Sequence, residues 1–185
     1  MTTRLPLLRP DDLSASQRDL YDAVTQGWHP NSPASQSGQL NAPYNAWLYA
    51  PDIGQLFHSF ALGLRDSITI SDRARELAIL IVAAHPFSDF AWNAHVGRAR
   101  ALGISDEQID AIRVDRQPEV EDPVELVVVE SARAIVMERD LADELYERAV
   151  KVLGPQGLIE LLALCGWYQS LALQFRVFRV PPRQA

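Results

Sequence analysis

A glutamate and a histidine from two consecutive predicted helices form the strongest chemical signal in this sequence. His95 belongs to a helix predicted over 88–102, and it lies on the apolar side of that helix with Trp92. Glu76 opens the preceding segment, 76–84, which is apolar all round after its first residue and is therefore predicted to be a buried helix. A carboxylate that orients an imidazole can support general acid or base catalysis at neutral pH.

The connection between the two predicted helices places Glu76 and His95 at the same height. Only residues 85–87 separate the helices, and such short connections usually join antiparallel neighbours. At a rise of about 1.5 Å per residue, Glu76 lies roughly 12 Å from the turn and His95 roughly 10.5 Å from it. We therefore expect the two side chains to meet inside the protein. The alternative is a polar core contact without chemistry, although burying two ionisable groups for packing alone is costly.

Five further residues are candidates for binding a substrate, and several have a structural alternative. Arg75 could reach a substrate carboxylate or form an ordinary ion pair, and Trp92 could form a wall against a flat substrate. His85 could line the mouth of the pocket or remain a solvated turn residue. Ser88 stands at the start of the second helix, where it also suits a helix cap. His58 could serve as a second base or lie at the edge of the core.

The composition predicts a globular protein and argues against several classes. The chain has 185 residues, a formal net charge of −7 and 22% charged residues, which fits one domain over 1–185. The negative charge argues against a nucleic-acid or anionic-membrane binder. A single cysteine excludes an intramolecular disulfide and a cysteine-rich zinc site, and no metal or other cofactor is predicted. The lack of a signal sequence and of a long apolar run leads us to expect a cytoplasmic protein with no membrane partner.

The start and stop signals along the chain are helical. Capping motifs, prolines at helix starts and glycines at helix ends divide the chain into helices near 14–27, 51–65, 71–84, 88–102, 105–113, 124–139, 141–153 and 156–174. No convincing strand pattern occurs. Residues 29–43 have the composition of a long loop, which could form a lid. The predicted fold class is therefore all-α.

Three segments of the sequence resemble the carboxymuconolactone decarboxylase / alkylhydroperoxidase D superfamily. These segments are Arg75–Leu80, Ser88–His95 and Ala101–Ile109. The resemblance is good over roughly 40–112 and weaker over 125–175. It implies a single helical domain of about seven to eight helices, which assembles as trimers or hexamers and has a pocket framed by its central pair of helices.

The sequence departs from the peroxidase members of that superfamily at the positions of their two cysteines. Those members carry Cys-x-x-Cys-x-x-x-His, whereas this chain has Ser88 and Ala91 at the cysteine positions before His95. Neither side chain can supply an attacking thiolate or a resolving thiol, so thiol peroxidase activity is rejected. The resemblance therefore implies the cysteine-free branch, whose named member decarboxylates a carboxylated lactone without a cofactor.

The sequence thus predicts a cofactor-free acid/base enzyme with His95 and Glu76 as its catalytic residues. The expected reaction is decarboxylation (a lyase reaction) or isomerisation of a small carboxylated lactone or an enolisable keto acid. One alternative is a hydrolase, cyclase or dehydratase on the same scaffold, since folds do not fix chemistry. The other is a non-catalytic ligand-binding oligomer. A cavity beside the pair would favour an enzyme, and a pair sealed in the core would favour a structural role.

Overall fold

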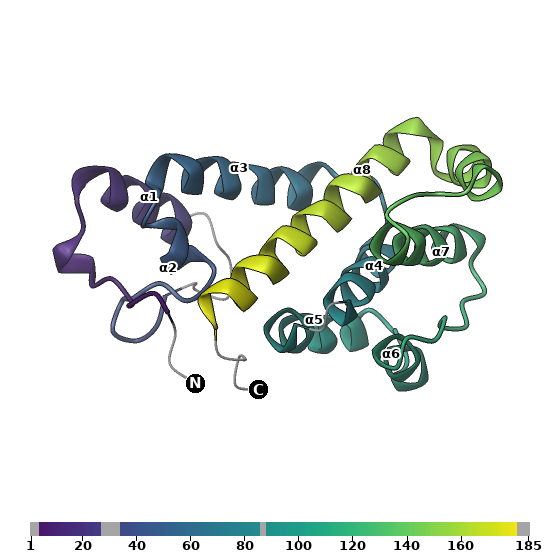
Figure 1. The fold of residues 1–185 in the computed structure, drawn as a ribbon, viewed down its shortest axis with the longest axis horizontal. Helices are drawn as coiled ribbons and strands as arrows, with labels where there is room; N and C mark the ends of the chain where they lie inside the picture. The colour runs from purple at the N-terminus through teal and green to yellow at the C-terminus, as the bar shows by residue number, and fades with distance from the viewer. Residues whose placement is uncertain (1–3, 27–33, 86–87, 181–185) are drawn as a thin grey trace. The chain divides into compact units, whose positions relative to one another are not determined.

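The computed structural model describes residues 4–26, 34–85 and 88–180, and it is built from helices. In chain order these are α1 (Ala15–Gln26), α2 (Tyr44–Trp47), α3 (Pro51–Ser67), α4 (Asp72–Ala84), α5 (Asp89–Ala101), α6 (Asp106–Arg113), α7 (Pro123–Met137) and α8 (Asp143–Phe178), preceded by the short 3-10 helix Pro10–Asp12. Within the described residues there is no strand, only an isolated bridge between Ala34 and Leu40. The all-α prediction is confirmed (Figure 1).

The chain forms two compact units. The first comprises the described parts of Met1–Asp66 together with Val177–Val180, and the second comprises the described parts of Ser67–Arg176. The prediction of one domain over 1–185 stays a prediction. Of the loop predicted over 29–43, residues 34–43 are described, and 29–33 lie outside the described residues.

Close helix packing defines the core of the first unit. A Cβ atom at Gly54 of α3 would collide with the side chain of Leu20 on α1 and would lie 2.9 Å from Cβ of Trp47 on α2. Only glycine lets the three helices approach this closely. The start of α1 matches the predicted capping motif, because Ser14 N donates to Gln17 Oε1 at 2.9 Å and Gln17 N donates to Ser14 Oγ at 3.4 Å.

Helix α4 is the centre of the second unit. Every residue from Ala74 to Ala84 is buried, because α4 packs against α5, α6 and α7 (Figure 1). Apolar side chains all round the segment make this possible, as the sequence predicted. The starts of α4, α5 and α6 carry the predicted serine caps, in which Ser71, Ser88 and Ser105 accept hydrogen bonds from backbone N–H groups.

Helix α8 contains a sharp kink. Gly154 has φ of 69°, in the left-handed region that glycine tolerates, and Pro155 follows it. The kink separates the two helices that the sequence predicts over 141–153 and 156–174. Within the described residues, α8 is the one helix long and apolar enough to cross a bilayer by length and composition, and a third of its most apolar stretch is buried. The core helices of soluble proteins can have the same length and composition, so these two features are weak evidence for a membrane span.

Candidate active site

Glu76 and His95 meet as the sequence predicts. Nδ1 of His95 on α5 lies 2.7 Å from Oε2 of Glu76 on α4. The Glu76 side chain is 1% exposed, whereas the His95 side chain keeps 19% of its surface exposed. An ionised carboxylate can only accept hydrogen bonds, so beside an ionised Glu76 the proton of this contact belongs to Nδ1. The pair therefore combines a buried anchor with an imidazole that reaches the surface.

The capping of α4 and α5 sets this meeting point. Ser71 Oγ accepts from Ala74 N at 3.2 Å, which fixes the first turn of α4 just before Glu76. Ser88 Oγ accepts from Ala91 N at 3.4 Å and starts α5. With both helix starts fixed and the two helices packed together, Glu76 and His95 face one another.

Arg98 is a third member of the site. Its Nε lies 3.1 Å from Glu76 Oε1, so the two oxygens of the carboxylate contact two different residues. Arg98 Nη2 also lies 3.8 Å from Asp72, and Asp72 lies 2.6 Å from Arg75 Nη2. Positive and negative groups thus alternate along this edge of α4 and α5. Arg98 is not among the site residues predicted from the sequence, although its position three residues after His95 on the same helix indicates that the two side chains are neighbours.

Tyr168 of α8 packs against the imidazole. The ring centroids of Tyr168 and His95 are 5.2 Å apart, and the ring planes cross at 84°, an edge-to-face arrangement. No short-range pattern in the sequence links the two residues, because they lie 73 positions apart on separate helices.

The remaining predicted binding residues occupy other positions. Arg75 is buried and paired with Asp72, and the buried Ser88 caps α5. Trp92 is buried, with the Arg113 guanidinium 5.9 Å from its ring centre. Their predicted contacts with a substrate stay predictions.

The other two predicted histidines differ from His95 in their surroundings. His85 Nε2 lies 3.2 Å from Asp115 Oδ1, at ion-pair distance but without hydrogen-bond geometry. His58 belongs to the first compact unit, where it is buried and its Nε2 has no hydrogen-bond partner among the described residues. Burial, followed by the charge of Arg65, lowers the pKa of His58 below its ordinary value of 6.5. Among the residues that the structure describes, neither imidazole has a hydrogen-bonded carboxylate of the kind that orients His95.

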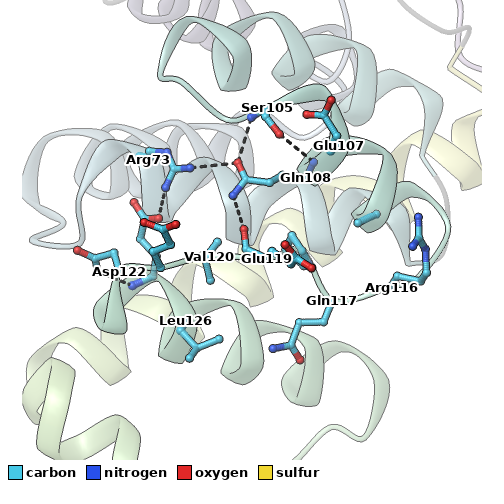
Figure 2. A pocket seen from close by; sticks show the side chains of 14 residues that line it. Arg73, Ser105, Glu107, Gln108, Arg116, Gln117, Glu119, Val120, Asp122 and Leu126 are labelled. Carbon is cyan, nitrogen blue, oxygen red and sulfur yellow. Dashed lines mark hydrogen bonds and ion pairs between the residues drawn. The ribbon is translucent and has the colours of Figure 1, made fainter.

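A broad pocket lies in the second unit between α6, α7 and the segment that joins them (Figure 2). Its volume is about 1210 Å³, above the roughly 300–1,000 Å³ of typical small-molecule pockets. Acidic side chains dominate its charged lining, namely Glu107, Glu119, Glu121, Asp122 and Glu125 against Arg73 and Arg116. Glu76 and His95 are not among its lining residues, so this pocket does not supply the cavity expected beside the pair.

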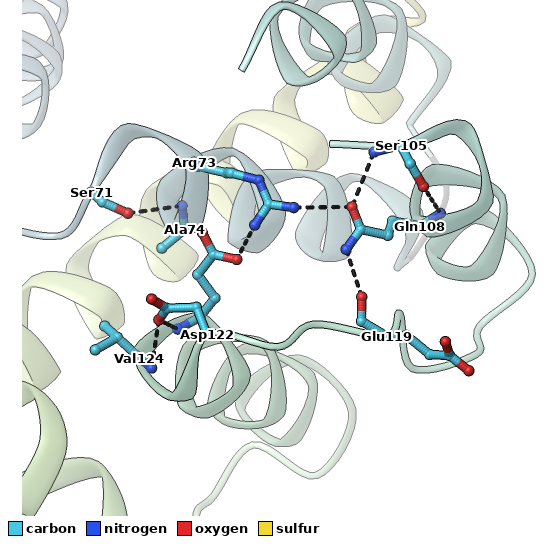
Figure 3. Close-up of polar contacts among 9 residues, drawn as sticks. Ser71, Arg73, Ala74, Ser105, Gln108, Glu119, Asp122 and Val124 are labelled. Carbon is cyan, nitrogen blue, oxygen red and sulfur yellow. Dashed lines mark hydrogen bonds and ion pairs between the residues drawn. The ribbon is translucent and has the colours of Figure 1, made fainter. Parts of the chain in front are cut away.

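Arg73 of α4 lines this pocket and makes polar contacts with α6 and α7 (Figure 3). It pairs with Glu125 of α7, and its Nη2 donates to Gln108 Oε1 of α6 at 3.1 Å. The same Gln108 oxygen also accepts from Ser105 N at 3.0 Å. The amide nitrogen of Gln108, Nε2, donates to the carbonyl oxygen of Glu119 at 2.5 Å. These contacts join α4 to α6 and α7.

The single cysteine is placed where it cannot act as a thiolate. Cys165 is buried in α8, and burial raises the pKa of its thiol to about 12. About one thiol in 10⁵ is then ionised at pH 7. This placement agrees with the rejection of thiol peroxidase chemistry, which the sequence based on Ser88 and Ala91.

Comparison with solved structures identifies the fold. The alkylhydroperoxidase AhpD core of an uncharacterized peroxidase-related protein from Ralstonia eutropha JMP134 matches with a TM-score of 0.75 and 12% identity, covering 98% of this chain and 93% of that one. A variant of the debrominase Bmp8 in complex with 2,3,4-tribromopyrrole matches with a TM-score of 0.72 and 13% identity over 99% and 92% of the two chains.

A third solved structure also matches this chain, whereas comparisons of the sequence alone find no relative. The Agrobacterium tumefaciens protein ATU0492, described as a putative antioxidant defence protein AhpD, has a TM-score of 0.66 and 16% identity, and it covers 76% of this chain and 97% of that one. No protein-family model matches the sequence, and no curated protein matches it significantly. The structural likeness extends over the chain at identities that establish the fold alone. This chain therefore has the helical fold of the alkylhydroperoxidase D-like proteins, as the resemblance of its sequence predicted.

Proposed function

We propose that this protein is a cofactor-free acid/base enzyme acting on a small organic acid, with His95 as the catalytic residue and Glu76 as the group that orients it. The contact between His95 Nδ1 and Glu76 Oε2 at 2.7 Å carries the proposal. A buried carboxylate that fixes one ring nitrogen leaves Nε2 of His95 as the atom that can exchange a proton with a substrate. The substrate class we propose is a carboxylated lactone or an enolisable keto acid.

Decarboxylation would use the imidazolium form of His95. The bond between the substrate carbon and its carboxylate breaks, carbon dioxide leaves, and the electron pair moves into the adjacent carbonyl as an enolate. His95 Nε2 then gives its proton to the carbon, the enolate returns to a carbonyl, and solvent reprotonates the imidazole. Glu76 would stabilise the positive ring through Nδ1. In an isomerisation, neutral His95 would take a proton from one carbon and return it to another.

The structural neighbours support small-molecule chemistry on this fold. The debrominase structure contains a tribromopyrrole, a small ring compound. The burial of Cys165 in this chain favours chemistry by proton transfer over chemistry by a thiolate. A decarboxylase or an isomerase is the finer assignment that the following experiment tests.

The test is turnover of a panel of carboxylated lactones and β-keto acids, with carbon dioxide release and product formation measured separately. His95→Gln is expected to lose about 10²–10⁴-fold in kcat/KM, since a positioned general acid or base contributes that much. Glu76→Gln is expected to lose between about 10-fold and 10⁴-fold, because the amide does not stabilise a positive imidazole. The matched control is Arg100→Met on the same helix, an exposed residue paired with Asp106.

The outcomes separate the proposal from its alternatives. Product without carbon dioxide would assign an isomerase, hydrolase, cyclase or dehydratase in place of a decarboxylase. Unchanged turnover in folded His95→Gln would contradict the catalytic role of the pair. A panel compound that raises the melting temperature without being converted would favour a ligand-binding protein, because a ligand stabilises the state that it binds.

A further inference from the structure

We propose that Arg98 is a positioning residue, which keeps Glu76 ionised and thereby holds His95 with its proton on Nδ1. Arg98 itself does not need to touch the substrate. The catalytic meaning of this arrangement rests on the function proposed above, but the arrangement can be tested without any substrate.

The two oxygens of Glu76 define its protonation state. Oε2 lies 2.7 Å from His95 Nδ1, and Oε1 lies 3.1 Å from Arg98 Nε. Oε1 therefore lies at ion-pair distance from the positive guanidinium of Arg98, while Oε2 is in hydrogen-bond contact with the imidazole. If Glu76 were instead a neutral carboxyl group with its proton on Oε2, that O–H would donate a hydrogen bond to His95 Nδ1. The charge of Arg98 beside Oε1 opposes this neutral form, because a positive group at that distance favours the carboxylate.

The ionised carboxylate then fixes the tautomer of the imidazole. An ionised carboxylate carries no proton to donate, so beside it His95 Nδ1 is the donor of the 2.7 Å contact. In the neutral ring, the proton on Nδ1 leaves the lone pair on Nε2. Arg98 therefore decides, through Glu76, which nitrogen of His95 can accept a proton from outside the pair.

The charge of Arg98 also balances that of Glu76. Glu76 is 1% exposed, and a buried carboxylate needs a positive or hydrogen-bonding partner. Without Arg98 the positive partner would have to be His95, held as an imidazolium. With Arg98 present, His95 is free to be neutral and to change its charge during a reaction.

The neighbouring groups leave Arg98 as the residue that performs this task. Asp72 and Arg75 of α4 pair with each other at 2.6 Å, and Tyr168 of α8 meets the imidazole through its ring. Asp72 also lies 3.8 Å from Arg98 Nη2, which helps to hold the guanidinium toward α4. Half of the Arg98 side chain is exposed, but its Nε contacts a buried oxygen, which distinguishes it from an ordinary surface ion pair.

The test is an NMR titration of the imidazole nitrogens from pH 5 to 9 in the full-length protein. The His95 signals are assigned by their absence from the spectrum of His95→Gln. We expect the parent to show the Nδ1-protonated neutral ring at high pH. In Arg98→Met the midpoint of the His95 titration should rise by about 1 pH unit or more, because His95 is then the one group left among the described residues that can offer a positive charge to Glu76 at ion-pair distance. Arg98→Lys should retain a midpoint close to that of the parent.

Two further variants make the result decisive. Arg98→Gln keeps a polar side chain but not the charge, so it should shift the midpoint like Arg98→Met and replaces it if that variant does not fold. Arg100→Met removes an arginine that pairs with Asp106 and should leave the His95 titration unchanged. A neutral ring protonated on Nε2 in the parent, or an unchanged midpoint in the folded Met or Gln variant, would overturn the proposal. A shifted midpoint alongside full turnover in His95→Gln would support the role of Arg98 and reject the proposed function.

Discussion

Two histidines of this chain show how its surroundings determine what an imidazole can do. His95 forms a hydrogen bond with Glu76, and its side chain is partly exposed. His58 is 5% exposed, and its Nε2 has no hydrogen-bond partner among the described residues. Burial disfavours the charged form of His58, so its pKa is lowered. A buried, neutral imidazole on α3 fits a packing role better than the role of a second catalytic base, which the sequence also allowed.

The buried ring of His58 should make the protein less stable in mild acid. Because the folded pKa of His58 lies below the unfolded value of about 6.5, the unfolded chain binds more protons between those two pH values. The contribution of His58 to the free energy of unfolding is therefore complete above pH 6.5, falls as the pH falls toward the folded pKa, and levels off below it. Urea denaturation at pH 7.5, 6.5 and 5.5 measures this dependence. The free energy of unfolding should fall less between pH 7.5 and 5.5 in His58→Phe than in the parent.

A matched histidine serves as the control for this measurement. His85 has a partly exposed ring near Asp115, so His85→Gln should retain the contribution of His58 to the pH dependence. Equal losses of stability in the parent and in a folded His58→Phe would show that the buried imidazole does not govern acid stability.

At the scale of elements, α4 organises the second unit. Its apolar faces bury it among α5, α6 and α7, while Arg73 at its start joins Glu125 and Gln108 by polar contacts. Glu125 is buried, so loss of its positive partner would leave a poorly compensated charge. The arginine is therefore predicted to contribute to stability.

The role of Arg73 can be measured against that of an exposed arginine. Arg73→Met should lower the free energy of unfolding by about 1–3 kcal/mol, the usual cost of leaving a buried polar group without its partner. Arg100→Met removes a pair in which both side chains are more than half exposed, and the change should stay within about 1 kcal/mol. Chemical denaturation of both variants at pH 7 checks the difference. Equal effects would contradict a structural role for the contacts of Arg73 in the pocket.

At the scale of the whole molecule, the apolar surface of α8 bears on assembly. Ile159, Leu162 and Leu173 are large, exposed and spaced so that they share one face of the helix. Exposed apolar groups on one helix face are typical of a surface that another chain covers. The resemblance implies trimers or hexamers, and the second copy of this chain is the partner that we predict for this face.

Substitution on that face should change the mass of the protein in solution. The mass of the parent in solution is expected to be a multiple of 20.7 kDa. Leu162→Glu should lower this mass toward that of the monomer, because a charge on each copy opposes burial of the face. Lys151→Glu, an exposed change on the same helix, should keep the parent mass. Sedimentation velocity at micromolar concentration distinguishes these outcomes. A monomeric parent would refute the prediction.

Local chemistry explains why much of this molecule could be predicted from its sequence. Serine caps start α4, α5 and α6, and Gly103 follows α5 with a φ of 80°. The apolar run after Glu76 required a buried helix, and a short connection to the next helix placed His95 opposite it. These features depend on residues close together in the chain, and the helical fold follows from them.

The tertiary structure decided which side chains from distant parts of the sequence contact one another. Tyr168 meets His95, and Arg73 reaches Glu125, only because particular faces of separate helices pack together. Arg98 was within reach of sequence reasoning, but its turn inward to Glu76 depends on the close packing of α4 and α5. Helix periodicity determines which residues share a face, whereas the choice of the facing helix and its register depends on the packing of the whole core.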